Sequence, residues 1–293
     1  MTDMSDRTAA LPDRLFAAAA RIRPAHAIGT ALLFLGAWVM LFPYIWMISS
    51  SMKPADEVYD ADFSIIPETF AGLQNYGDVL FGQPYPRFML NSLIVCVGIL
   101  LVQLLTAVPA AYALAKLRFR GSAILLGTVI ACLTIPINVT SIPLYLGVVK
   151  AGLLDTYFAM MFPFLVSVFA IFLFRQFFRG FPDSIIDAAR VDGFSEMEIV
   201  IRLILPSAIP AVAAFSVFSF VSHWNDLYWP LIVVQSQDKM TAALSMMQYK
   251  SEFDTNYGRS FAAATVVTIP MLLVFLFARR AFIRGITMTG VKG

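Results

Sequence analysis

The residue types that usually make and break covalent bonds are scarce in this sequence. It has two histidines, His26 and His223, and two cysteines, Cys96 and Cys132, and they are widely separated along the chain. A membrane-embedded enzyme would need convergent nucleophiles or metal ligands, which these residues cannot supply. No Gly-Lys dipeptide occurs, so the chain lacks a phosphate-binding Walker loop. We therefore expect no catalytic residue and no metal site.

Polar residues inside otherwise apolar segments are the next candidates, because they are costly in a bilayer and often mark the path of a solute. Five such residues form the candidate pathway: Gln103, Asn138, Trp224, Asn225 and Asp226. Amides and carboxylates bind hydroxyl groups, and aromatic rings stack on sugar rings. Two alternatives stay open. The two amides, Gln103 and Asn138, would instead join helices by hydrogen bonds, and Trp224 would belong to an interfacial belt of aromatic residues.

The composition places these residues in a membrane protein. Hydrophobic residues make up 59% of the chain, charged residues 14%, and the mean hydropathy is +0.76. Soluble domains carry about a quarter charged residues. A soluble fold could not bury this much apolar surface.

Six long windows contain no Asp, Glu, Lys or Arg. They are residues 27–52, 88–115, 121–149, 156–174, 203–225 and 260–278. A helix that crosses a bilayer needs about 20 mainly apolar residues. Lipid admits only helices or closed barrels, and barrel strands would be shorter and alternating. The sequence therefore predicts an all-α integral membrane protein with six transmembrane helices.

The basic residues predict the orientation. If the N-terminus is inside, 15 of the 21 Lys and Arg residues fall on the inner segments, where positive charge is retained. Both termini are thus predicted to be cytoplasmic. Residues 1–26 form a cytoplasmic N-terminal segment, residues 27–280 the transmembrane domain, and residues 281–293 a cytoplasmic C-terminal tail.

The one long inner connection carries signals for a short helix. Pro182 suits the start of a helix, and Ser184 followed by Asp187 fits a capping box. The helix would end at Gly193, because glycine is best suited to a left-handed C-terminal cap.

A second capping signal follows at once, at Ser195 and Glu198, and predicts another helix that ends near Pro206. Ala188 and Ala189 have little side chain, so a partner protein could approach the backbone closely there. The loop of residues 181–206 is thus either a knob for protein docking or an amphipathic connector on the membrane.

Three segments resemble a known family. The string Asp187-Ala188-Ala189-Arg190-Val191-Asp192-Gly193, with Leu205-Pro206 after it, looks like the coupling loop of ATP-binding-cassette importer permeases. The usual pattern opens with Glu-Ala-Ala, so Asp187 keeps the charge with a shorter reach. The segments His223 to Pro230 and Arg279 to Gly293 are similar to the fifth span and the C-terminal tail of the carbohydrate-uptake, maltose-type branch.

The resemblance implies a type I importer permease fold in the bacterial inner membrane and a division of labour. A second, homologous permease would complete the pathway, and an extracytoplasmic solute-binding protein would deliver a sugar, oligosaccharide or polyol. Two copies of an ATPase subunit would grip the coupling loops and bind ATP and Mg²⁺, so this chain would hold no cofactor and no nucleic acid. The implied coupling residues are Asp187, Ala188, Ala189, Arg190, Asp192, Gly193, Leu205 and Pro206.

Two alternatives remain. The cargo of the same importer type would be glycerol phosphate or another non-sugar solute. A secondary transporter would usually show paired ionisable residues in its spans or inverted repeats, and only Asp226 comes near that description.

The division of basic residues generates a test of topology. In intact cells, Gln74→Cys and Gln237→Cys should react with an impermeant thiol reagent, and Arg118→Cys should not, because positively charged segments stay inside. Labelling of the Arg118 position alone would reverse the orientation.

Overall fold

The computed structural model describes residues 24–59, 64–82, 84–249 and 256–289, and all regular elements in these ranges are helical. Three helices are each long and apolar enough to cross a membrane: α2 (Pro24–Ser50), α4 (Tyr85–Lys116) and α15 (Tyr257–Thr289). They correspond to the first, second and sixth apolar windows.

The other three windows form bent pairs of helices and not single continuous helices. Helices α5 (Ser122–Cys132) and α6 (Ile137–Lys150) meet at 101°. The pair of α7 (Tyr157–Met161) with η3 (Phe162–Phe164) meets α8 (Val168–Arg179) at 46°. Helix α12 (Ile209–Trp224) lies at 81° to the helical segment Glu196–Ser207 before it. The described residues thus offer three spans, or up to six if each bent pair counts as one.

Each bend coincides with a residue that favours the start of a new helix. Pro136 is the N-cap of α6, and Pro210 lies in the first turn of α12. Proline lacks a backbone N–H, so it fits the first turn of a helix better than the interior. Ser167 caps α8 by accepting a hydrogen bond from the backbone N–H of Ala170 at 3.1 Å. The hydropathy of the sequence does not indicate where a helix ends and the next one begins in a new direction.

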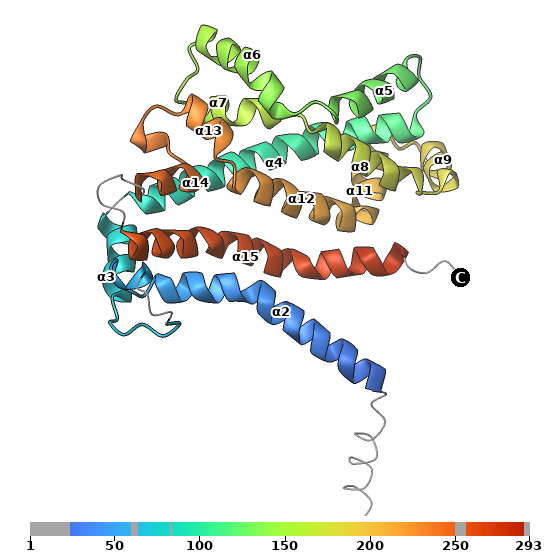
Figure 1. Cartoon of the computed structure of the whole chain (residues 1–293). Helices are drawn as coiled ribbons and strands as arrows, with labels where there is room; N and C mark the ends of the chain where they lie inside the picture. Colours follow the sequence, from blue (N-terminus) through green and yellow to red (C-terminus); the bar gives the residue numbers. More distant parts are fainter. Residues whose placement is uncertain (1–23, 60–63, 83, 250–255, 290–293) are drawn as a thin grey trace, which may run out of the picture.

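The helices form three rough layers (Figure 1). Helix α4 lies in the middle layer with α8 and α12, and α15 packs against α12 on one side and α2 on the other. Helices α5 and α6 diverge on the far side of the middle layer. Helix α2 packs on α15 at the edge of the bundle, and most of its side chains are exposed.

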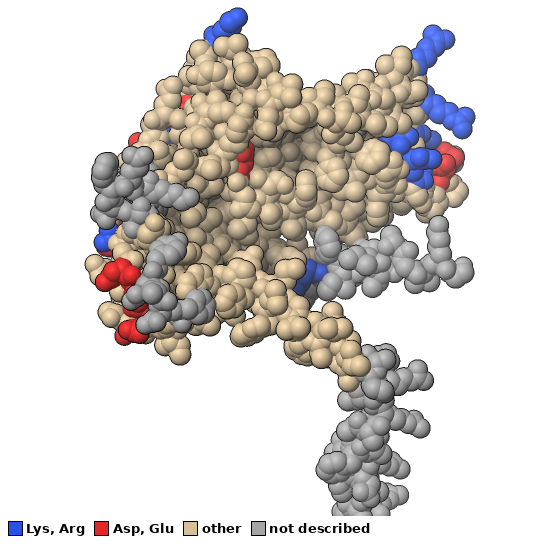
Figure 2. Space-filling view, viewed as in Figure 1, with Lys and Arg blue, Asp and Glu red and all other residues tan. Residues whose placement is uncertain are grey.

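The two ends of the bundle carry different elements. At the right of Figure 1 lie α9 (Asp183–Val191), the turn between α4 and α5, the start of α2 and the end of α15. At the other end lie α3 (Gly72–Gly77), α13 (Tyr228–Val233) and α14 (Ala242–Ser245). Figure 2 shows that Lys and Arg gather at the first end. The described parts of the segments predicted to be cytoplasmic therefore share one end of the molecule.

The structure describes the predicted boundary of the C-terminal tail but only the end of the predicted N-terminal segment. Helix α15 continues to Thr289, so the proposed start of the tail at residue 281 falls inside a helix. The last residues, 290–293, and the N-terminal residues 1–23 lie outside the described part of the chain.

At the end opposite α9, the start of α15 touches the loop that follows α2. The Lys53 side chain is buried there, and its Nζ donates a hydrogen bond to the Ser64 carbonyl at 2.6 Å. The Asn75 amide nitrogen donates to the carbonyls of Ser51 and Lys53 at 3.0 and 2.8 Å. A Cβ on Gly258 would lie 2.4 Å from the Lys53 carbonyl oxygen. The absence of a side chain at Gly258 therefore permits this close approach.

This contact predicts the effect of one methyl group. Gly258→Ala should destabilise the protein by about 1 to 3 kcal/mol, because the loop must move away from α15. The measurement is the thermal unfolding midpoint of the purified chain in detergent. Gly147→Ala is the matched control: Gly147 also lies in a helix, and a Cβ there would meet nothing within 4 Å. Equal midpoints for both variants would contradict the packing described.

Candidate functional site

The first loop helix, α9, ends as predicted but begins differently. It starts at Asp183 after Pro182, which makes no side-chain cap. The predicted capping box of Ser184 and Asp187 is therefore wrong, because Ser184 already lies inside the helix. Gly193 has φ +85°, the left-handed conformation expected of it.

Two backbone hydrogen bonds complete this helix end. The Gly193 N–H donates to the Arg190 carbonyl at 3.1 Å, and the Phe194 N–H donates to the Ala189 carbonyl at 3.0 Å. This pair of bonds is the Schellman motif, which depends on a left-handed residue after the helix. Gly193 thus sets the angle at which the chain leaves α9.

The second loop helix begins with the predicted capping box. The Ser195 hydroxyl accepts from the Glu198 N–H at 3.3 Å, and the Glu198 carboxylate accepts from the Ser195 N–H at 3.0 Å. Helix α10 (Glu196–Ile199) then runs through a π-helical turn, η4 (Val200–Ile204), into α11 (Leu205–Ser207), whose first turn contains Pro206. The loop is therefore a continuous series of short helices that leads into α12.

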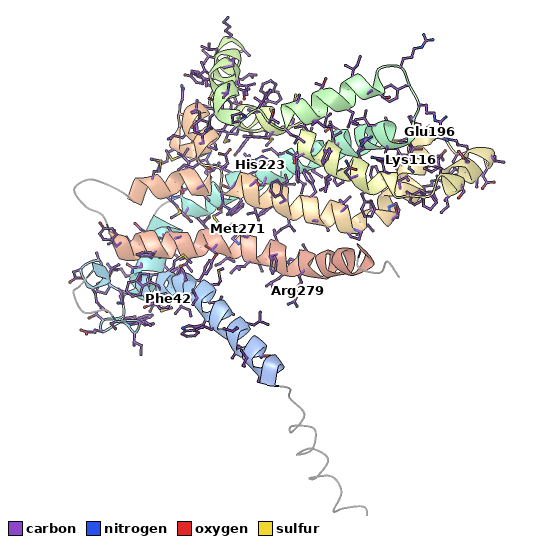
Figure 3. The ribbon with its side chains drawn as sticks, turned by 45° about the vertical axis from the view of Figure 1, so that its right-hand side comes forward. Phe42, Lys116, Glu196, His223, Met271 and Arg279 are labelled. Atoms are coloured by element: carbon purple, nitrogen blue, oxygen red, sulfur yellow. The ribbon has the colours of Figure 1, made fainter. Side chains whose placement is uncertain are left out.

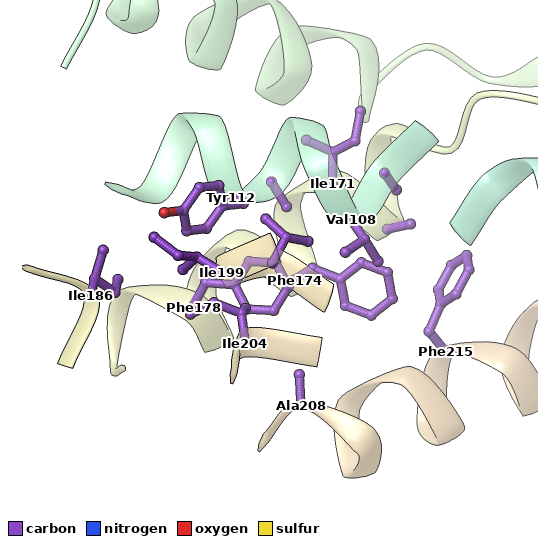
Figure 4. Packing of buried hydrophobic residues seen from close by; sticks show 14 of the residues in the cluster. Val108, Tyr112, Ile171, Phe174, Phe178, Ile186, Ile199, Ile204, Ala208 and Phe215 are labelled. Carbon is purple, nitrogen blue, oxygen red and sulfur yellow. The ribbon is translucent and has the colours of Figure 1, made fainter. Parts of the chain in front are cut away.

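One face of the loop is buried against the transmembrane helices (Figure 4). Ile186, Ala189, Ile199 and Ile204 belong to an apolar cluster with residues of α4, α8 and α12. Ala189 is only 6% exposed, and its methyl group contacts this chain's own core; its part in coupling stays a prediction.

The other face of α9 is exposed and carries apolar residues. Ile185 is 45% exposed and Val191 88% exposed, and Ala188 and Asp192 are also on the surface. Ile185, Ala188 and Val191 are spaced three residues apart, so they share one side of the helix. We call these three residues the outer face of α9.

A hydrogen-bonded network of charged groups connects the two loop helices to α4. Arg190 donates to Asp187 Oδ1 at 2.9 Å and to Glu196 Oε1 at 2.8 Å. The Tyr112 hydroxyl, on α4, donates to Glu196 Oε2 at 2.5 Å. The bond from Arg190, and then that from Tyr112, hold the pKa of Glu196 below its usual range. The same bond to Glu196 is the main reason that the pKa of Arg190 is raised.

Lys116 makes a second connection at the end of α4. Its Nζ donates to the Phe181 carbonyl and to Asp183 Oδ1, both at 2.6 Å. The bond from Lys116 lowers the pKa of the Asp183 carboxyl. Lys116 and Glu196 lie at the same end of the bundle (Figure 3). Sequence reasoning missed Tyr112, Lys116 and Glu196, because their partners are distant in the chain or on the next helix.

The predicted pathway residue Gln103 is buried and joins three elements. Its Nε2 donates to the Phe164 carbonyl at 2.8 Å, and its Oε1 accepts from the Ser219 hydroxyl at 2.6 Å. The same Nε2 lies 3.5 Å from Nε2 of His223. The helix-joining alternative therefore describes the observed contacts of Gln103.

Trp224 lies in the core and not on a surface. It is 1% exposed, its indole N–H donates to the Val267 carbonyl at 3.0 Å, and its ring stacks on Phe220. In this structure the Trp224 ring is covered by residues of its own chain, and its place in the solute pathway stays a prediction. Trp229 is likewise buried, with its indole N–H donated to the Ala159 carbonyl at 2.8 Å.

The remaining predicted pathway residues lie in separate environments. Asn138 is exposed on α6. Asn225 is exposed, and its amide nitrogen donates to the Val221 carbonyl and to Met271 Sδ. The Asp226 carboxylate accepts from the Trp229 N–H at 3.3 Å and so supports the start of α13. Within the described part of the chain, no group of three or more His, Cys, Asp or Glu residues is placed to hold a metal ion.

The apolar bundle, its bent helices and the loop at one end define a helical membrane protein. A similar fold occurs in a chain of a bacterial ABC transporter involved in the import of the acidic polysaccharide alginate. The TM-score is 0.74 and the identity 23%, over 92% of this chain and 98% of that one.

The family model for binding-protein-dependent transport system inner membrane components matches residues 103–288, and the chain belongs to this family. It is therefore a multi-pass inner-membrane transport subunit, which confirms the resemblance seen in the loop.

Three relatives have comparable lengths. The arabinooligosaccharides transport permease of Halalkalibacterium halodurans is 31% identical over 88% of this chain and 93% of its own. The diacetylchitobiose uptake permease of Streptomyces coelicolor is 32% identical over 94% of this chain and 89% of its own. The sn-glycerol-3-phosphate transport permease of Escherichia coli is 30% identical over 87% of this chain and 93% of its own.

The two alanines of the loop should respond differently to enlargement. Ala189→Leu should destabilise the chain by about 1 to 3 kcal/mol, because the added atoms enter a packed cluster. Ala188→Leu, its matched control on the exposed side, should leave stability within about 0.5 kcal/mol. Thermal unfolding of the two purified variants measures the difference. A stable Ala189→Leu variant would show that the inner face of α9 is not packed as described.

Proposed function

We propose that this chain is one of two permease subunits of an ATP-driven importer for a sugar, oligosaccharide or polyol. The observation that carries the proposal is the outer face of α9. It presents apolar side chains on a helix whose opposite face is fixed to the transmembrane core. Exposed apolar residues on a rigid, charged end of a molecule favour docking of another protein.

The partner at this face would be an ATPase subunit, present in two copies, with one copy on each permease. It would bind ATP and Mg²⁺, and this chain would contribute no group to hydrolysis. Asp187 is already bonded to Arg190. Its role would therefore be to hold the loop in shape, together with Asp192, Gly193, Leu205 and Pro206, and Ala188 would lie nearest the ATPase.

The arrangement of the ends supports a topology of six spans with both termini in the cytoplasm. Each bent pair of helices would count as one span. The start of α2 and the end of α15 lie at the same end as α9, where Lys and Arg gather. Basic residues favour the cytoplasmic side. The other end would then face the extracytoplasmic solute-binding protein, and the second permease would complete the pathway.

The cargo separates two versions of the proposal. Two of the relatives are named for oligosaccharides and one for sn-glycerol 3-phosphate. Import into vesicles by the complex, with its binding protein, should be measured for an arabinooligosaccharide, for diacetylchitobiose and for sn-glycerol 3-phosphate. ATP-dependent import of a sugar would support a sugar importer. Import of sn-glycerol 3-phosphate alone would support an importer of a non-sugar solute. Import without ATP would favour a secondary transporter.

The coupling role generates a mutational prediction. Gly193→Val should cost about 1 to 3 kcal/mol locally, because φ +85° is strained for a β-branched residue. The protein should stay in the membrane. The chain would leave α9 at a different angle, so binding of the ATPase to the loop should weaken. Ala188→Trp should do the same by blocking close approach, and Asp187→Glu should be tolerated. The measurements are co-purification of the ATPase and substrate-stimulated ATP hydrolysis.

Gly152→Val is the matched control. Gly152 also has positive φ, at +64°, and lies in the turn after α6 rather than in the loop. The Gly152→Val substitution should strain the backbone without reducing binding of the ATPase. If Gly193→Val and Ala188→Trp both keep normal docking and hydrolysis, the loop is not the coupling element.

A further inference from the structure

A small hollow opens between α8 and α12, outside the coupling loop. Its volume is about 250 Å³. The polar residues that line it are Gln103, Ser167, Ser219, Ser222 and His223, and the aromatic ones are Phe164, Phe169, Phe215 and Phe218. The labelled position of His223 in Figure 3 lies between the two ends of the bundle. The hollow is therefore in the membrane-spanning part of the chain.

Hydrogen bonding fixes the orientation of the His223 ring. The Phe164 carbonyl can only accept, so the nitrogen of the Gln103 amide, not its oxygen, faces it. The second hydrogen on that nitrogen is directed to Nε2 of His223, at 3.5 Å. The Gln103 amide nitrogen can only donate, so Nε2 of His223 is the acceptor of this contact. The Phe164 ring supports the imidazole, with 4.7 Å between the ring centroids.

The surface around the hollow combines exposed aromatic rings with a few polar groups. Ser222 is exposed on α12, a transmembrane helix, next to the half-buried His223. Ionisable side chains within a bilayer, such as that of His223, almost always face the interior of a bundle or a water-filled cavity. Phe169 and Phe218 beside them are 38% and 56% exposed. This face therefore joins apolar rings to hydrogen-bonding groups, and from the position of His223 we expect water to reach it.

We propose that this hollow is a contact site for one ring of the sugar cargo on its way across the membrane. Ser222 and His223 bind ring hydroxyl groups, and Phe169 and Phe218 cover the apolar C–H face of the ring. Ligand sites commonly combine apolar walls with a few placed polar groups. The hollow is smaller than the cavities of about 300 to 1,000 Å³ that enclose drug-sized ligands, so it holds one ring and not a chain. Few contacts suit a pathway, where cargo must bind and leave again.

The inference rests on the proposed sugar importer, and its test uses the assembled complex. In a chain with Cys96 and Cys132 replaced by alanine, Ser222→Cys is treated with a water-soluble methanethiosulfonate reagent. Leu33→Cys is the control, because Leu33 is 76% exposed on α2 at the edge of the bundle, in an apolar stretch. Ser222→Cys should react at least about tenfold faster, since thiolate forms in water and not in lipid. The sugar that the complex imports should slow this reaction.

Import provides the second measurement. His223→Leu should lower the rate of sugar import about threefold to tenfold, which is the effect of one lost hydrogen bond. His223→Gln keeps a donor and an acceptor and should restore most of the rate. Co-purification of the ATPase should be unchanged in both variants, because the coupling loop is not altered.

The outcomes separate this inference from the proposed function. If the unaltered complex imports neither sugar, the sugar importer itself is wrong and the sugar contact falls with it. If the unaltered complex imports a sugar, three results each overturn the contact site alone. They are labelling of Ser222→Cys no faster than of Leu33→Cys, labelling that the sugar does not slow, and normal import by His223→Leu.

Discussion

Burial of the inner face of the loop against α4 and α8 is the interaction on which the rest of the functional site depends. Ile186 and Ile199 are almost fully buried, in one cluster with Phe174 and Phe178 of α8. Each buried side chain of this size contributes about 1.5 to 3 kcal/mol. By contrast, Arg190 and Glu196 are 37% and 44% exposed, and exposed ion pairs contribute at most about 1 kcal/mol. Apolar packing therefore holds the loop in place, and the charged network sets its detailed shape.

The bends in the transmembrane helices explain why polar residues occur where they do. A helix that breaks inside a membrane leaves backbone carbonyl and N–H groups without partners, and lipid offers none. At the break between η3 and α8, the Ser167 hydroxyl accepts from the Ala170 N–H and the Gln103 amide donates to the Phe164 carbonyl. Gln103 is therefore first a structural residue. The same geometry directs its second hydrogen to His223, so the structural role and the orientation of the hollow's imidazole are linked.

Sequence patterns revealed those features that depend on local chemistry. The three spans formed by single helices, the left-handed Gly193 and the capping box at Ser195 all follow from composition or from residues within one turn. Patterns failed where the answer depended on distant partners. Ala189 and Trp224 are buried by residues far away in the chain, and neither motif nor hydropathy indicates which side of a helix will be covered. His223 lacked any partner visible in the sequence, because Gln103 is 120 residues away.

The loop and the hollow belong to one packed body. Helix α12 begins at Ile209, directly after the loop, and carries Ser219, Ser222 and His223 near its far end. Residues of α4, α8 and α12 share the apolar cluster that buries the loop (Figure 4). A packed core of this kind resists gradual deformation. A force applied to the outer face of α9 would therefore move the two walls of the hollow together. The hollow would then change its exposure by moving against a neighbouring subunit, as in transporters that rock as rigid bodies, and not by changing its own shape.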